Sequence, residues 1–228
     1  MWIKKIFSYC KKINILKTIY YNFKLFPFKH AIKLPLFIYR KTNVKFGKDN
    51  IHITGEISSG MIKIGIPLTH FVDPNEKTII ISNGIIELKG KCDIGSGSKI
   101  AISKSGYLKI GSNFNVTGSL RICCEHYIKI DDDCMFSWDV SLLDTDYHPI
   151  KDIENKIINS PRPIKIGKHV WIGCNCIILK GVTIADNSII SAGSIVKKGL
   201  DSTNTVYGMP SNILQPLKCG VLWTKDIF

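Results

Sequence analysis

Aliphatic residues return at every sixth position over the last third of the chain, and this spacing constrains the fold more than any other feature. The series is Ile166, Ile172, Ile178, Ile184, Ile190 and Val196. An amphipathic helix repeats its apolar face at three and four residues, and a half-buried strand repeats at two. A fixed self-similar spacing of six residues is the unit of a hexapeptide β-helix. The sequence therefore predicts an all-β solenoid rather than a sandwich of ordinary strands.

Small residues occupy the other inward positions of each hexad. A slender residue stands four positions after each aliphatic, in the series Val170, Cys176, Val182, Ser188 and Ser194. We expect the aliphatic side chain to point into a narrow prism, with the small residue facing it where no bulk fits. Three hexads would close one three-sided coil, and successive coils would stack by backbone pairing.

The repeat extends upstream in a looser form. From about Ile51, short β-type runs are broken by glycine, and the sixfold step reappears up to Leu142. The step between Ile122 and Ile130 is eight, so a slip of register is expected there. We predict three parts: a basic, partly helical segment at 1–50, the β-helix domain at 51–212, and a tail at 213–228.

One insertion interrupts the prism at residues 143–163. It contains Asp144, Asp146, His148 and three prolines. A loop of this length in a compact repeat domain is either functional or disordered. Its aromatic residue and its prolines favour a functional loop extruded from one coil.

Positive charge is concentrated at the N-terminus. Residues 1–48 hold eleven lysines, Arg40 and no acidic residue, which gives +12 of the total +13. The segment is compatible with one or two amphipathic helices. It could meet an anionic membrane surface or a phosphate-bearing substrate, or it could pack on the first coil with its lysines in water. Aromatic motifs of RNA-binding domains are absent, so we expect no nucleic-acid partner.

Targeting signals and metal motifs are not evident. The apolar runs at the N-terminus are cut by lysine and no cleavage site follows, so we expect a retained segment. The eight cysteines include no C-x2-C pair, so we expect no metal site. Cys134 and Cys176 fall in the small inward position, which is typical of core thiols in a reducing compartment. The expected location is cytoplasmic, at the inner membrane face if the basic segment binds lipid.

Three passages stand out: SWDVSLLDTDYHPI, then KHVWIGCNCIILKGVTIADNSIISAGSIVKKG, and YGMPSNI. They resemble the hexapeptide-repeat acyltransferases, most closely the galactoside, maltose and polysaccharide O-acetyltransferases. The resemblance covers about Ile51 to Leu214. It implies a left-handed parallel β-helix of hexapeptide repeats and a homotrimer. It also implies acetyl-CoA as a co-substrate bound between neighbouring prisms, with no bound cofactor.

The resemblance assigns the acid–base chemistry to the loop. His148 matches the catalytic histidine, and an imidazole suits a general base because its free pKa lies nearest neutrality. Asp146 would fix the ring by accepting from its other nitrogen. Asp144 or a backbone carbonyl could do this instead, and Asp144 could also bind the acceptor sugar.

The coenzyme contacts are implied in the same way. The backbone amide of Cys174 would bind the oxyanion, against the alternative that its thiol is a nucleophile. Trp171 would line the pantetheine arm or pack in the trimer interface. Ala192 would admit the arm, and Lys197 and Lys198 would reach the phosphates. The family's terminal basic residue is Asn212 here, so Lys180 or another lysine would have to replace that contact.

The predicted function is acetyl transfer from acetyl-CoA to a hydroxyl of a glycan or a lipid-linked glycan precursor. Asn115 and Glu125 match the acceptor contacts of the galactoside enzymes. Acyl transfer to an amino sugar, an antibiotic or serine is the alternative. A carbonic anhydrase on the same prism would need two histidines five apart, and the six histidines contain no such pair. A catalytically silent trimeric scaffold is a third reading.

Overall fold

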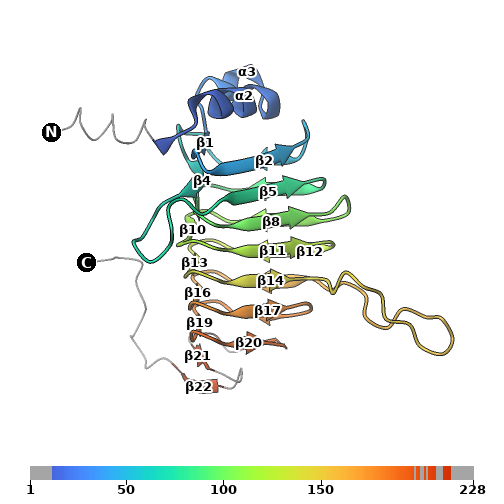
Figure 1. Cartoon of the computed structure of the whole chain (residues 1–228). Coiled ribbons are helices and arrows are strands. Elements are labelled where there is room, and N and C mark those ends of the chain that lie inside the picture. Colours follow the sequence, from blue (N-terminus) through green and yellow to red (C-terminus); the bar gives the residue numbers. More distant parts are fainter. Residues whose placement is uncertain (1–11, 198, 201–202, 204, 209–212, 217–228) are drawn as a thin grey trace.

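The chain folds into a three-sided prism of stacked coils, seen in a computed structural model (Figure 1). The structure describes residues 12–216 except 198, 201–202, 204 and 209–212. Three sheets of nine, seven and six strands form the three faces, which we number in that order. Up to β20, every third strand of the sequence joins the same face, and β21 and β22 then extend the first face. Neighbouring strands are parallel apart from the last pair, β21–β22.

The strands are short because each spans one side of the prism. The first face contains β1 (Leu36–Ile38), β4 (Ile62–Ile66), β7 (Cys92–Gly95), β10 (Phe114–Val116), β13 (Met135–Phe136), β16 (Trp171–Ile172), β19 (Ile189–Ile190), β21 (Thr205–Tyr207) and β22 (Ile213–Pro216). The second face contains β2 (Thr42–Phe46), β5 (Thr78–Ser82), β8 (Lys99–Ile102), β11 (Arg121–Cys124), β14 (Ser141–Leu143), β17 (Ile177–Leu179) and β20 (Ile195–Val196). The third face contains β3 (Ile51–Ile53), β6 (Ile85–Leu88), β9 (Tyr107–Ile110), β12 (Tyr127–Ile130), β15 (Ile164–Ile166) and β18 (Thr183–Ile184).

The core is the interior of the prism, and the sixfold series fills it. All six of its members are at most 1% exposed. They stack in register, with Ile172 beside Ile190 and Ile178 beside Val196. The small inward positions are buried as well: the Cys176 thiol donates to the Ser191 carbonyl at 3.1 Å, and its burial raises the pKa of the thiol. The predicted inward and outward pattern is thus confirmed for these coils.

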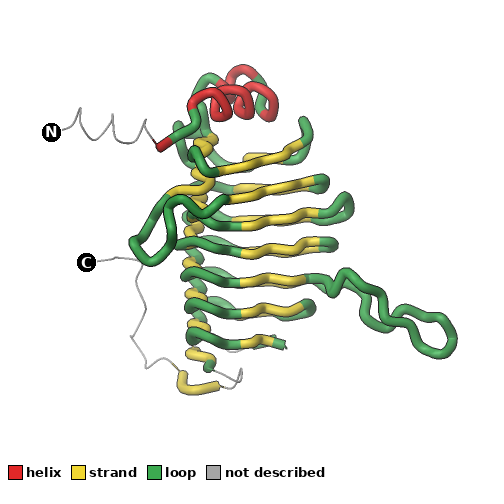
Figure 2. Tube along the Cα trace, in the orientation of Figure 1, coloured by secondary structure: helices red, strands yellow, loops and turns green. Residues whose placement is uncertain are grey.

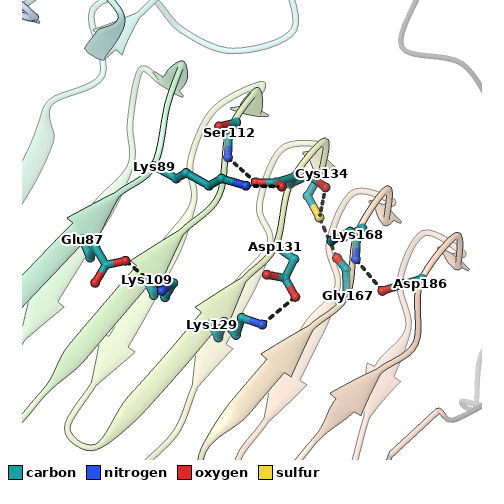
Figure 3. A network of polar contacts seen from close by, with 11 residues as sticks. Glu87, Lys89, Lys109, Ser112, Lys129, Asp131, Cys134, Gly167, Lys168 and Asp186 are labelled. Atoms are coloured by element: carbon teal, nitrogen blue, oxygen red, sulfur yellow. Dashed lines mark hydrogen bonds and ion pairs between the residues drawn. The ribbon is translucent and has the colours of Figure 1, made fainter. Parts of the chain in front are cut away.

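Polar side chains link the coils at the outer corners (Figure 3). Asp186 accepts a hydrogen bond from the Lys168 N–H at 2.7 Å, one coil away. On the third face, an ion pair joins the neighbouring coils of Lys109 and Glu87 at 2.8 Å. At its corner, Lys89 reaches Asp132 two coils away at 2.7 Å. The Asp186 contact satisfies a turn amide that the strands leave without a partner.

Two helices cover the first coil, α2 (Ile15–Leu25) and α3 (Phe28–Ala31). The side of α2 that faces β1 is polar. Thr18 Oγ1 accepts from the Ile38 N–H, and Asn22 both accepts from the Leu36 N–H and donates to the Leu36 carbonyl. These bonds satisfy the exposed edge of the first sheet. Most of the larger apolar residues of α2 consequently point outward, whereas Leu25 is buried.

The structure places the start of the prism earlier than the boundary expected at residue 51. Strands β1 and β2 already pair with β4 and β5, so the first coil begins at Leu36. The loop inserted after β14 projects far from the body (Figure 2). Within the described part of the chain, no helix has the length and apolar character needed to cross a bilayer.

Candidate active site

The extruded loop leaves the second face where β14 ends at Leu143 and returns at β15, which begins at Ile164. We call the turns that lead from the second to the third face the second corner, and the turns from the first to the second face the first corner. The loop therefore projects from the second corner (Figure 1). His148 lies near its base and its side chain is exposed.

Asn159 holds the two arms of the loop together beside His148. Its amide nitrogen donates to the His148 carbonyl at 2.8 Å and to Asp146 Oδ2 at 3.0 Å. Its amide oxygen accepts from the Ile150 N–H at 2.6 Å. One side chain thus fixes the backbone on both sides of the histidine.

Lys180 ties this arrangement to the next coil of the prism. Its Nζ donates to the Asp146 carboxylate and to the Asn159 carbonyl, the latter at 2.6 Å. The hydrogen bond from Lys180, followed by that from Asn159, lowers the pKa of Asp146. The carboxylate of Asp146 is therefore an anchor for the loop base. From the sequence, Lys180 was expected only as a contact to the coenzyme, and no sequence pattern pointed to Asn159.

The turn before His148 is tight. The His148 N–H donates to the Asp146 carbonyl at 2.7 Å, and Tyr147 between them has φ 60°, in the left-handed region. Such conformations persist only where the surroundings impose them, and they are frequent at functional sites. Here Thr145 imposes it, because its hydroxyl accepts from the Tyr147 N–H at 3.0 Å and donates to the Glu125 carboxylate.

A cavity of about 260 Å³ opens beside this turn. It is lined by Glu125, Asp146 and His148, together with residues of the returning arm. The structure thus brings together three of the residues predicted from the sequence. Among the described residues, the His148 imidazole has no hydrogen-bond partner, so Asp146 contacts the histidine through its backbone and not through the ring.

Asp144 is completely buried, at 0% exposure. Its carboxylate accepts from the N–H groups of Glu125, His126 and Tyr127 at 2.8 to 2.9 Å. These residues form the eight-residue step at which the repeat slips, so Asp144 closes the irregular corner. This placement favours a structural role over the expected contact with the acceptor sugar.

The residues expected to bind the coenzyme lie on the opposite edge of the second face. Cys174 and Ala192 belong to the first corner, one coil apart, and the Gly193 N–H donates to the Cys174 carbonyl at 2.8 Å. Gly173 is required there, because a Cβ at this position would be 2.6 Å from the Ala192 nitrogen. Trp171 is half-buried in β16 and donates from Nε1 to Ser137 at 3.4 Å.

The remaining predicted contacts are dispersed. Lys197 follows β20 and is exposed, whereas Lys198 and Asn212 lie outside the described residues. Asn115 is half-buried in β10 on the first face and does not line the His148 cavity. No cluster of three potential metal ligands occurs within the described ranges.

One chain therefore does not assemble the predicted site. The loop with His148 leaves the carboxyl ends of the second-face strands, and Cys174 stands before their amino ends. The width of a face separates them. In a single copy, the predicted base and the predicted oxyanion donor therefore lie at opposite edges of one face.

The comparisons with known proteins agree with this architecture. Residues 163–198 match the model of the bacterial transferase hexapeptide (six repeats). The putative acetyltransferase YJL218W of Saccharomyces cerevisiae is 30% identical over 155 residues, which is 64% of this chain and 73% of that protein. The polysialic acid O-acetyltransferase of Escherichia coli O1:K1 / APEC is 35% identical over 61% of this chain, but the match spans only 42% of that protein.

A solved structure supports the fold. The crystal structure of the polySia specific acetyltransferase NeuO superimposes with a TM-score of 0.59 at 24% identity, covering 81% of this chain and 77% of the other. The expected left-handed parallel β-helix is thereby confirmed. The chain belongs to the hexapeptide-repeat family of acetyltransferases.

Proposed function

We propose that the protein transfers an acetyl group from acetyl-CoA to a hydroxyl of a glycan or glycan precursor, with His148 as general base. The observation that carries this proposal is the exposed imidazole at the base of a loop fixed by Asn159 and Lys180. A base held at one place on a rigid prism can be presented to a bound thioester with little loss of orientation.

The chemistry needs two groups. The imidazole of His148 removes the proton of the acceptor hydroxyl while its oxygen attacks the thioester carbonyl carbon. The resulting tetrahedral oxyanion accepts a hydrogen bond from the backbone N–H of Cys174. When the intermediate collapses, the carbon–sulfur bond breaks, and the leaving thiolate of the coenzyme is protonated by the imidazolium.

The separation of these groups supports a homotrimer. In a cyclic trimer, the second corner of one copy can face the first corner of the next. His148 of one copy then meets Cys174 and Ala192 of its neighbour, and acetyl-CoA lies between them. Lys197 would reach the coenzyme phosphates. Asn212 stands where the family has a basic residue. Lys180 is already hydrogen-bonded to Asp146 and Asn159, so it does not replace that contact to the coenzyme.

The acceptor assignment rests on the cavity and the relatives. Glu125 lines the His148 cavity, where a carboxylate could accept from sugar hydroxyls. The relative from Escherichia coli O1:K1 / APEC is described as acting on polysialic acid. Transfer to an amino group would use the same base, so the acceptor panel must include amino sugars.

A direct test uses labelled acetyl-CoA with nucleotide sugars, lipid-linked oligosaccharides, finished polymers and amino sugars. Mass spectrometry then identifies the acetylated product. We expect His148→Ala to lose activity by a factor on the order of 10² to 10⁴ while light scattering shows an unchanged trimer. Normal turnover in this variant would disprove the mechanism, and acetylation of amines alone would change the function to N-acyl transfer.

The helical cap supports contact with an anionic membrane. Seven large apolar residues of α2, α3 and the residue after α3 are 44 to 82% exposed: Ile15, Leu16, Ile19, Tyr20, Phe23, Phe28 and Ile32. The segment 1–48, to which they belong, carries a net charge of +12 and contains no acidic residue. Exposed apolar side chains flanked by lysine are typical of surface-bound helices. In a trimer with parallel prisms, three caps would face the same plane. We propose that acetylation takes place there, at the inner face of the membrane.

A further inference from the structure

A second cavity lies at the first corner of the prism, remote from His148. Its volume is about 620 Å³. It is bounded by Lys12, by the turn Tyr39–Lys41 between β1 and β2, and by the loop at residues 67–77 between β4 and β5. We call it the basic groove.

All the charged side chains that line the basic groove are basic. Lys12, Arg40 and Lys41 line it together with His70, and no carboxylate does. None of the three cations forms an ion pair with another residue in the part of the chain that the structure describes. Residues 1–11 contain no acidic residue that could supply one. Clustered cations repel each other unless an anion lies between them.

The carboxylates of the same loop are engaged elsewhere. Asp73 accepts from the Asn75 N–H at 2.8 Å. Glu76 pairs with Lys99 at 3.1 Å and accepts from the Ser119 hydroxyl at 3.0 Å, on later coils. The loop is thereby fixed to the prism, while no carboxylate of the described residues compensates the positive charge of the groove.

An exposed aromatic residue continues the groove along the first corner. Phe71 stacks on Trp138, with ring centroids 5.5 Å apart and an interplanar angle of 11°, and it remains 81% exposed. The Trp138 carbonyl accepts from the Asn175 N–H at 3.1 Å, directly after Cys174. The loop at 67–77 extends toward these later coils (Figure 1). The basic groove, Phe71 and Cys174 thus lie in sequence on one corner.

We propose that the basic groove binds an acidic group, a carboxylate or a phosphate, on an oligosaccharide acceptor whose next sugars run over Phe71 toward Cys174. This inference rests on the proposed function, because the path of the acceptor toward Cys174 assumes that the acetyl transfer takes place there. The expected coenzyme contacts Ala192 and Lys197 lie on the C-terminal side of Cys174. The acceptor therefore approaches from the N-terminal side, where the groove is.

The distance sets the size of the acceptor. Four strand spacings separate β4 from β16 on the first face, which corresponds to about 19 Å. A single sugar cannot span that length, so only an oligosaccharide or polymer can occupy the groove and reach the reaction centre together. Binding should also weaken with salt, because exposed charges are screened within about 10 Å at 0.1 M.

The test compares binding of the full-length protein to four probes: a fluorescent oligosialic acid, a glycerol-phosphate oligomer, a neutral maltooligosaccharide and vesicles containing phosphatidylglycerol. The groove variant is Arg40→Gln/Lys41→Gln. Its control is Lys165→Gln/Lys168→Gln, which removes the same charge from exposed positions on and beside the third face. We expect at least one acidic oligosaccharide to bind more tightly than the neutral one, and the groove variant to weaken it at least tenfold while the control does not.

Several outcomes would overturn the inference. Equal binding of acidic and neutral oligosaccharides would show that no acidic group is recognised. An equal loss of affinity in the groove variant and in the control would show that binding depends only on the net charge of the protein. Loss of vesicle binding alone would assign the groove to lipid. Binding is measured without acetyl-CoA, so a failure of catalysis does not affect this test. In turnover, the groove variant should raise the KM of the oligosaccharide but leave kcat and the KM of acetyl-CoA unchanged.

Discussion

Lys180 donates from Nζ to the carboxylate of Asp146, and this contact joins the extruded loop to the prism. The lysine side chain is only 13% exposed, whereas that of the aspartate is 48% exposed. The pair is thus buried at the end that belongs to the rigid coil and open at the end that belongs to the loop. Such an arrangement positions the histidine rather than stabilising the fold, because a half-exposed ion pair contributes little to stability.

Lys180→Met should therefore lower kcat without unfolding the protein. The methionine keeps the packing of the aliphatic stem, and Asp146 can be solvated by water. We expect a fall in kcat on the order of tenfold or more, since loss of orientation costs this much in similar sites. The KM of acetyl-CoA should be unchanged. Steady-state kinetics would check this, with Lys165→Met as the control, and an unchanged kcat would contradict the role of the ion pair.

The same contact predicts a pH dependence. The pKa of Asp146 is lower in the folded protein than in the unfolded chain. The stabilisation from its ion pair with Lys180 is therefore fully present above the unfolded pKa of about 3.9, and it is lost as the pH falls through the folded pKa. The loop base should thus stay intact from neutral pH down to about pH 4. In Lys180→Met, the Asp146 pKa should rise toward its ordinary range. Carbon-detected NMR titration of the carboxylate would measure both values.

Asp144→Asn should destabilise the protein. The buried carboxylate accepts three backbone N–H groups, and an amide nitrogen cannot replace an accepting oxygen. At least one N–H would be left without a partner, at a cost of about 2 kcal/mol. Urea unfolding would measure it. The control is Asp186→Asn, where a single N–H bond to Oδ1 can be kept at an exposed corner. A stable variant with a raised acceptor KM would instead restore the predicted sugar contact.

Cys174→Ser should keep most of the activity. The proposed donor to the oxyanion is the backbone N–H, which the substitution retains. We expect kcat within a few-fold of the original, and no acetylated enzyme by mass spectrometry during turnover. An acetyl group on Cys174, together with inactivity of the serine variant, would establish a covalent intermediate and exclude direct transfer.

Leu16→Ser and Phe28→Ser should weaken binding to anionic vesicles. These side chains are 82% and 73% exposed, so their loss does not disturb the core. Removing one large apolar side chain from a membrane contact costs about 1.5 to 3 kcal/mol, which corresponds to roughly tenfold or more in affinity. Vesicle co-sedimentation would measure this, with Ile153→Ser in the loop as the control. Point substitutions are needed because deletion of residues 1–48 would remove β1 and β2 from the first coil.

The sequence by itself determined the prism and the position of the loop. The sixfold series from Ile166 to Val196 is a local pattern, and burial of each aliphatic follows from it directly. The eight-residue step at Ile122 located the irregular corner. The interruption after Leu142 located the loop that carries His148. Each of these features depends on residues close together in the chain.

The tertiary structure alone decided what the polar side chains do. Asp146 bonds to Lys180, 34 residues away, and Asp144 turns inward to the slipped corner. Thr18 and Asn22 face the edge strand, so the apolar side of α2 points outward. His148 and Cys174 lie on opposite edges of one face. These outcomes depend on which coil stacks beside which and on how the loop folds back. A period of six residues fixes the spacing along the chain but carries no information about such long-range pairing.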